Sequence, residues 1–192
     1  MKNFLDGSDI AGIIGLNPDK TPYSVWHSIV HPLGEGDEIE TEKISAKLAP
    51  AIASLYEDAS GKKTIIPLEK KICHPEYKFL AGNPVRFVED DGILETYLSD
   101  SKIGLEFLPQ HWYLKLIFDM GITKKQRGSA AWLENGLKFS FTDIEFDEEL
   151  YTLMIAEAVD FFIYFVLTKN PPDKMALDYL NEREVKQSSL CE

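Results

Sequence analysis

Residues 79–100 of this 192-residue chain, FLAGNPVRFVEDDGILETYLSD, decide which fold the sequence predicts. Two runs rich in β-branched and aromatic residues are joined by the acidic turn Glu89-Asp90-Asp91-Gly92, a pattern that is typical of a β-hairpin. The second run carries Glu95 among apolar neighbours. A carboxylate on a central strand is costly to leave ionised and alone, so we expect Glu95 to be protonated, hydrated or paired.

The segments around this hairpin predict an α/β fold. An amphipathic helix is expected over residues 42–59, where apolar residues recur at helical spacing: Ile44, Leu48, Ile52 and Leu55. The other predicted elements are three consecutive antiparallel strands over residues 64–73, 77–88 and 93–99, a helix over 112–120 closed by Gly121, a hairpin around Asn135-Gly136, and a closing helix over 147–167. We therefore predict one domain over residues 1–168, a central mixed β-sheet flanked by helices, and a carboxyl-terminal tail over residues 169–192.

The amino-terminal motif makes the prediction more specific. Ser8 or Asp9 is expected to cap a short helix there. The order of motifs along the chain resembles that of the YqaJ-like viral recombinases, relatives of phage lambda exonuclease in the PD-(D/E)XK nuclease superfamily. The matching stretches are residues 7–18 (GSDIAGIIGLNP), Thr21-Pro22, Trp26, Leu48-Ala49-Pro50, residues 83–98 and residues 109–121. The resemblance covers roughly the first two thirds of the chain and implies a restriction-endonuclease-like fold of the lambda exonuclease type.

The same resemblance implies which positions carried the ancestral chemistry. Family members hold two divalent cations, usually magnesium, with carboxylates from a helix and from both strands of the hairpin, and a lysine orients the attacking water. Matched position by position, the helix glutamate falls on Ala49, the first-strand aspartate on Val85, and the second-strand glutamate on Glu95, which is kept. The lysine position is Tyr97, and a helix position that usually carries glutamine holds Lys115.

These substitutions predict a degenerate active site. The side chains of Ala49 and Val85 cannot bind a metal, and Glu95 alone should not hold a magnesium pair. We therefore expect no metal cofactor, with Glu95 as the one retained ligand position, and a catalytically inactive domain that serves as a DNA- or protein-binding module. We also expect Lys115 or the Tyr97 hydroxyl within hydrogen-bond reach of Glu95, where it would neutralise the pocket.

Two alternatives remain open at this point. The chain could be an active DNA exonuclease, dependent on magnesium or manganese, with a rearranged ligand set drawn from Glu89, Asp90, Asp91 and Glu106. It could also be an acidic partner-binding or DNA-mimic module, because the formal net charge is −12.

The distribution of charge indicates where DNA would bind. Basic residues slightly outnumber acidic ones over residues 62–127, whereas acidic residues dominate residues 143–192. Because phosphate contacts come largely from Lys and Arg, we expect a DNA-facing surface in the middle of the chain. The candidate contacts to phosphate are Ser8, Arg86, Lys124, Lys125 and Arg127. The expected partners are duplex DNA ends or a protein, and a homo-oligomer is also expected.

The remaining features bear on location. With only Cys73 and Cys191, the chain has too few cysteines for a disulfide framework, and we see no secretory signal at its start, so we expect a cytoplasmic protein. The apolar stretch over residues 151–167 is interrupted by Glu157 and Asp160, and we interpret it as a core helix with no membrane partner.

Overall fold

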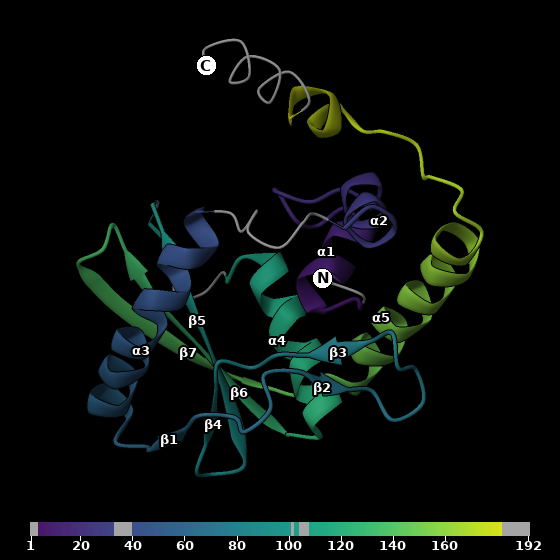
Figure 1. Ribbon diagram of the computed structural model, residues 1–192. Coiled ribbons are helices and arrows are strands. Elements are labelled where there is room, and N and C mark those ends of the chain that lie inside the picture. Colours follow the sequence, from purple (N-terminus) through teal and green to yellow (C-terminus); the bar gives the residue numbers. More distant parts are fainter. Residues whose placement is uncertain (1–3, 33–39, 101, 104–107, 182–192) are drawn as a thin grey trace.

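The computed structural model describes residues 4–32, 40–100, 102–103 and 108–181 (Figure 1). Its helices are α1 (Gly7–Ile13), α2 (Pro22–Val30), α3 (Glu40–Ser60), α4 (Gln110–Thr123) and α5 (Glu148–Phe161), which continues as the π-helix η1 (Phe162–Leu167). Its strands are β1 (Thr64–Ile65), β2 (Ile72–Cys73), β3 (Ala81–Gly82), β4 (Arg86–Val88), β5 (Gly92–Ser99), β6 (Arg127–Glu134) and β7 (Lys138–Glu145). A short helix follows at residues 176–181.

The main sheet is mixed, as predicted. Its strand order is β1-β4-β5-β6-β7, and all neighbours are antiparallel except β5 and β6. The helix α4 makes the crossover between the two parallel strands, as such a connection requires. The hairpin of β6 and β7 turns at Asn135 and Gly136, which both have positive φ (49° and 72°), the conformation that a type I′ turn needs.

Two predicted strands are wrong in extent. Residues 64–73 divide into β1 and β2, and residues 77–88 divide into β3 and β4. A proline follows the first strand of each pair, Pro67 after β1 and Pro84 after β3, and a proline cannot donate to a sheet. As a result β2 and β3 form a separate two-stranded sheet, while β1 and β4 join the main one.

Helices cover both faces of the main sheet (Figure 1). Alternation along β5 directs Ile93 into the larger core with α1, α4 and α5, whereas Leu94 packs with α3. We call these two sides the α4 face and the α3 face. Glu95 and Tyr97 share the α4 face with Ile93, because side chains two residues apart lie on the same side of a strand.

The helix α3 does not bury the residues that its spacing suggested. Ile44, Leu48 and Leu55 are 47%, 37% and 39% exposed, and Ile52, Ala53 and Tyr56 form the buried side instead. The prediction was correct for Ile52 alone. The buried Tyr56 hydroxyl finds a partner in Ser129, which favours this orientation of the helix over one that would bury leucines.

The helix α4 is longer than predicted. It runs through Gly121 to Thr123, and Lys124 ends it in the left-handed conformation (φ 57°). Gly121 has a packing role instead, because a Cβ atom at this position would lie 2.2 Å from the ring of Tyr151. The glycine therefore lets α5 approach α4 closely.

The closing helix is present but is mostly not in the core. Met154, Ala158 and Phe161 form its buried stripe. By length and composition, Glu148–Leu167 could cross a membrane: it has 20 residues, its mean hydropathy is 1.8, and 17% of that window is buried. The predicted extent of this helix, residues 147–167, is correct to within one residue, whereas its interpretation as a core helix is wrong in burial. A surface helix of a globular domain also buries a single apolar stripe, and here that stripe packs on α4. The absence of a membrane partner therefore stays a prediction.

The first residues of the predicted tail contact the domain. Asp178, in the short helix at residues 176–181, is buried and accepts a hydrogen bond of 2.5 Å from the Thr21 hydroxyl.

Candidate functional site

Glu95 lies on β5, an inner strand of the sheet, and is 2% exposed. The backbone N–H of Val85 donates a hydrogen bond of 3.2 Å to Glu95 Oε1. Val85 and Glu95, the two positions matched to the family's strand carboxylates, are therefore neighbours in space. The predicted hairpin is present, and one of the two matched positions carries no carboxylate.

A lysine fills the space in front of Glu95. Lys115 Nζ lies 2.7 Å from Glu95 Oε2 and 2.7 Å from Asp119 Oδ2. Lys115 and Asp119 are four residues apart on α4, so both face β5. The predicted contact between Lys115 and Glu95 is thus confirmed. We call Glu95, Lys115 and Asp119 the buried triad.

Sequence reasoning missed Asp119. The resemblance assigns no carboxylate to its position. The available signal was the spacing of Lys115 and Asp119, which puts both on one helix face toward Glu95.

Tyr97 does not join the buried triad. Its hydroxyl donates to the backbone oxygen of Trp112 at 3.3 Å, and its ring stacks on that of Trp112 with centroids 4.1 Å apart. Of the two predicted partners of Glu95, only Lys115 makes the contact. The position of the family lysine is therefore occupied by an aromatic side chain engaged elsewhere.

Burial sets the protonation of the triad. It raises the pKa of Glu95 to about 7, although Lys115 lowers this pKa and Asp119 raises it further. Burial likewise raises the pKa of Asp119, against the opposing effect of Lys115. Burial disfavours the charged form of Lys115, but Asp119 and Glu95 outweigh it and raise the pKa of Lys115 well above its ordinary value. Lys115 thus stays cationic, while burial favours the protonated form of both carboxylates.

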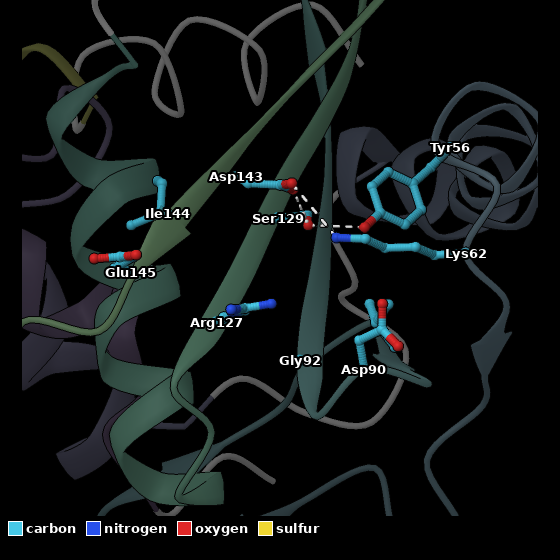
Figure 2. Close-up of a pocket in the computed structure, with 10 residues that line it drawn as sticks. Tyr56, Lys62, Asp90, Gly92, Arg127, Ser129, Asp143, Ile144 and Glu145 are labelled. Atoms are coloured by element: carbon cyan, nitrogen blue, oxygen red, sulfur yellow. Dashed lines mark hydrogen bonds and ion pairs between the residues drawn. The ribbon is translucent and has the colours of Figure 1, made fainter.

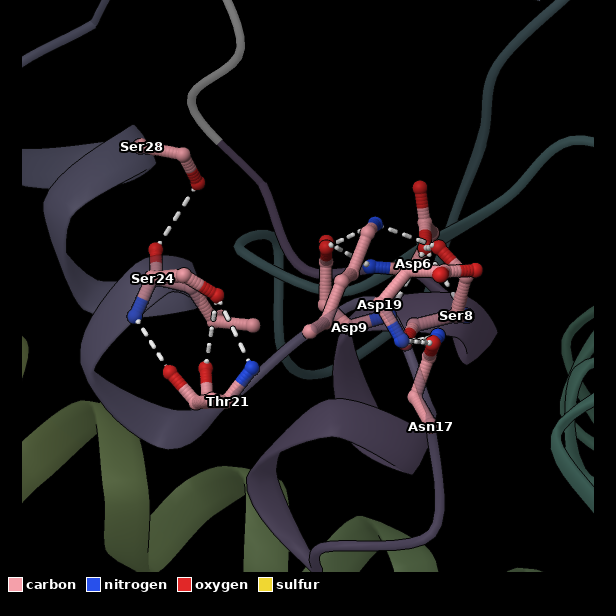
Figure 3. A network of polar contacts seen from close by, with 10 residues as sticks. Asp6, Ser8, Asp9, Asn17, Asp19, Thr21, Ser24 and Ser28 are labelled. Carbon is pink, nitrogen blue, oxygen red and sulfur yellow. Dashed lines mark hydrogen bonds and ion pairs between the residues drawn. The ribbon is translucent and has the colours of Figure 1, made fainter. Parts of the chain in front are cut away.

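Figure 3 shows the polar network at the start of α1. This network lies near the triad, because a Cβ atom on Gly7 would lie 2.7 Å from the Cα atom of Lys115. The N-cap of α1 is Asp6, not Ser8 or Asp9 as predicted. The Ser8 hydroxyl donates to Asp6 at 2.7 Å and accepts from Lys20 Nζ at 2.7 Å, so its one O–H donor is already used. Lys20 also pairs with Asp9 at 2.8 Å. The candidate phosphate contact at Ser8 is therefore engaged within the protein.

The other expected acids do not gather around Glu95. Glu89, Asp90 and Asp91 lie exposed in the turn before β5, and Asp91 pairs with Lys125. Asp91 and Glu95 are four residues apart, about 13 Å at the usual rise of a strand. Glu106 lies outside the described residues. The rearranged ligand set that we considered from the sequence is thus not assembled from this turn.

Ala49 lies on α3 and is half-buried. This helix packs on the α3 face, against Leu94 and Ala131. The position matched to the helix glutamate therefore offers only a methyl group.

The candidate DNA-binding residues are spread over one end of the sheet. The register pairs Arg86 with Leu94 and Arg127 with Gly92, which directs both arginines toward the α3 face. Lys124 and Lys125 lie in the loop between α4 and β6. Apart from Ser8, none of these candidates belongs to the networks around the buried triad that are described above.

Arg127 lines a cavity of about 290 Å³ on the α3 face (Figure 2). A chain of hydrogen bonds runs along its wall. Ser129 Oγ donates to Asp143 at 2.6 Å. Because the one hydroxyl proton of Ser129 is used in this bond, the Tyr56 hydroxyl donates to Ser129 at 2.9 Å. Lys62 Nζ lies 3.5 Å from the second carboxylate oxygen of Asp143. These contacts tie α3 to β6 and β7. The sequence did not lead us to expect this cavity.

Comparisons with known proteins agree with this architecture. The sequence model of a family described as the YqaJ-like viral recombinase domain matches residues 2–126. The uncharacterized protein YqaJ of Bacillus subtilis (strain 168) is 28% identical over 193 residues, covering 93% of this chain and 60% of that relative. This chain therefore spans less than two thirds of the relative's length.

Solved structures show the same fold. An alkaline exonuclease (LHK-Exo) from Laribacter hongkongensis superposes with a TM-score of 0.72 at 17% identity, covering 97% of this chain and 95% of that one. A phage-related exonuclease from Haemophilus somnus 129PT gives a TM-score of 0.64 at 11% identity, covering 88% and 96%. The predicted lambda exonuclease-like α/β fold is thereby confirmed.

Proposed function

Because the chain belongs to the YqaJ-like viral recombinase family, we propose that it retains the exonuclease-like domain as a DNA- or protein-binding module and has lost metal-dependent cleavage. The buried triad carries this proposal. Lys115 Nζ lies between Glu95 and Asp119, the point at which a cation bound by these two carboxylates would lie. An ammonium group there already offsets one of the two carboxylate charges.

The residues around the triad do not fit a pair of magnesium ions. Magnesium requires oxygen ligands at about 2.0–2.1 Å in near-octahedral geometry. The two other ancestral ligand positions are Val85 and Ala49, whose side chains offer no oxygen, and the ancestral lysine position is Tyr97, which is stacked on Trp112. We therefore assign no metal-dependent step to these residues.

One observation favours a second candidate, an active exonuclease with a rearranged site. Asp119 is a second buried carboxylate beside Glu95, at a position where the resemblance predicts none. If Lys115 moved away, Glu95 and Asp119 would be two oxygen ligands for one divalent cation, with water as the remaining ligands.

A nuclease assay separates these two functions. The substrate is linear duplex DNA with magnesium or manganese, and the matched proteins are the wild type and Glu95→Ala. We expect no cleavage above background from either protein. Cleavage by the wild type that disappears in Glu95→Ala would support the active enzyme instead.

A binding titration tests the retained role in DNA recognition. Fluorescence anisotropy with the same duplex at two salt concentrations should show binding that weakens as salt rises, because released counterions drive phosphate contacts. Arg127→Ala should lower the slope of log K against log salt by about 0.9 if this side chain contacts a phosphate. Lys169→Ala, a change in a lysine after η1, is the matched control and should leave the slope unchanged.

A further inference from the structure

Two histidines lie one helical turn apart at the end of α2. His27 is in the last turn of the helix and His31 is its C-cap residue, and both side chains are exposed. Residues four positions apart are neighbours on one face of a helix. The centroids of the two imidazole rings are 5.1 Å apart. We call His27 and His31 the histidine pair.

Both imidazoles of the histidine pair are available to a ligand. Within the part of the chain that the structure describes, no residue makes a hydrogen bond or an ion pair with either ring. The situation at His74 is different, because its Nδ1 accepts from the backbone N–H groups of Glu76 and Tyr77, both at 3.1 Å. A neutral imidazole has one nitrogen that can accept or coordinate. That nitrogen is engaged in His74, whereas both members of the histidine pair keep theirs for an ion.

Aromatic packing restrains the two rings. Trp26 is buried, and its indole N–H donates to the backbone oxygen of Phe165 at 3.0 Å, which ties α2 to η1. The ring centroids of His31 and His27 lie 5.5 Å and 6.4 Å from that of Trp26, both in edge-on arrangements. Because the indole is held in place, the imidazoles beside it are partly ordered in advance. Such ordering lowers the entropy cost of binding a ligand.

The separation of the rings matches that of two ligands of one metal ion. Zinc binds imidazole nitrogen at about 2.0–2.1 Å in tetrahedral geometry, which puts the centroids of two coordinating imidazoles about 5 Å apart. The observed separation is 5.1 Å. The χ2 torsion of histidine has broad minima, so each ring can turn a nitrogen toward the ion while its centroid stays almost fixed.

We propose that the histidine pair binds a first-row transition-metal ion of the zinc, nickel or copper type. Imidazole suits these ions, whereas magnesium and manganese prefer oxygen ligands. The histidine pair supplies two ligands, and water or an anion fills the remaining positions. The bound ion links the last turn of α2 to the residue that ends it. An ion that binds the folded chain more tightly than the unfolded chain also stabilises the fold.

This site is separate from the buried triad. The triad belongs to β5 and α4 and consists of two carboxylates with Lys115 between them. The histidine pair belongs to α2 and offers nitrogen ligands. Metal binding by the histidine pair is therefore independent of whether the domain cleaves or binds DNA.

Isothermal titration calorimetry with nickel chloride at neutral pH tests the proposal on the full chain. We expect the wild type to bind a single ion, and His27→Asn and His31→Asn each to lose this binding. The matched control is His74→Asn, which should bind nickel as the wild type does, because the nitrogen of His74 is already engaged. A wild type that binds no nickel, or a His74→Asn variant that loses binding as His27→Asn does, overturns the proposal.

A double variant, Ser28→His with His31→Asn, tests the spacing while the number of histidines stays the same. Adjacent helix positions point about 100° apart, so histidines at positions 27 and 28 do not face a common ion. We expect this variant to be folded by circular dichroism and to lose nickel binding. Nickel binding equal to that of the wild type would show that the four-residue spacing is irrelevant and would refute the site.

Zinc identifies the ligands directly in the wild type. During a zinc titration, the imidazole nitrogen-15 signals of His27 and His31 should shift together, and zinc should raise the midpoint of thermal unfolding. The chain has two other histidines, His74 and His111, whose signals should stay in place. Shifts at those two histidines without shifts at the histidine pair contradict the proposal.

Discussion

Lys115 brings a positive charge into a pocket that two buried carboxylates share. Glu95 and Asp119 are both 2.7 Å from its Nζ atom, and they are 2% and 0% exposed. Removing one member of such a buried set is far more damaging than replacing the whole set, because the remaining charges lose their partner. The residue-scale predictions follow from this asymmetry.

Lys115→Met should destabilise the fold strongly. Its two carboxylate partners would be left buried without a cation, which costs about 3–5 kcal/mol. Lys63→Met is the control, since Lys63 is 69% exposed and pairs with Glu57 at 3.4 Å. That change should alter stability by less than about 1 kcal/mol. Urea denaturation at pH 8 measures both, and a Lys115→Met protein as stable as the control would refute the pairing.

Glu95→Gln should change how stability depends on pH. Burial raises the pKa of Glu95 from 4.5 to about 7, so the folded state binds a proton that the unfolded state releases. This contribution to stability is complete below pH 4.5 and is lost as pH rises through about 7. Because Gln does not titrate, the variant should gain stability relative to the wild type across this interval, on the order of 3 kcal/mol. A difference between the two proteins that stays constant across this range would contradict the raised pKa.

At the scale of the elements, the close approach of α4 and α5 depends on one glycine. A Cβ atom on Gly121 would lie 2.2 Å from the Tyr151 ring. Both helices contribute to the core, Leu116 and Phe118 from α4 and Met154 and Ala158 from α5. A side chain at position 121 would therefore push the two helices apart.

Gly121→Ala should destabilise the protein by about 1–3 kcal/mol, the usual effect of overpacking a core. In a Tyr151→Ala background the same change should be neutral or stabilising, because Ala favours a helix over Gly by about 1 kcal/mol. Thermal or urea denaturation of the four proteins forms a double-mutant cycle. Equal effects of Gly121→Ala in the two backgrounds would show that Tyr151 is not the obstacle.

Elements with a single dominant signal could be predicted from the sequence. The Asn135-Gly136 turn and the hairpin that carries Glu95 are confirmed. The buried side of α3 could not be predicted, because two apolar stripes occur on that helix and spacing alone does not say which one meets the sheet. The strand breaks at Pro67 and Pro84 were available in the sequence and were missed.

Some contacts of the candidate site could likewise be predicted from the sequence, and others could not. The contact of Lys115 with Glu95 could be predicted from the matched family positions. Asp119 was missed because the family assigns no role to its position, although its spacing of four residues from Lys115 on α4 was visible in the sequence. The hydrogen bond from Lys20 that engages the Ser8 hydroxyl could not be predicted, since Lys20 lies twelve residues away.

At the scale of the whole molecule, the two faces of the sheet carry separate features. The buried triad lies on the α4 face, whereas the cavity at Arg127 and the hydrogen bonds of Ser129 lie on the α3 face. Changes on one face share no partner with changes on the other, so their effects on stability should add. Under the proposed function, a change at Arg127 should therefore affect DNA binding without affecting the buried triad.

The most direct measurement is a manganese titration followed by paramagnetic broadening of backbone amide signals. If Lys115 replaces the ancestral cation, the amides of Val85, Glu95 and Asp119 should broaden no more than those of exposed acidic positions such as Glu89 and Asp90. Selective broadening at Val85, Glu95 and Asp119 at low manganese would show a metal bound between the two carboxylates, and it would contradict the account.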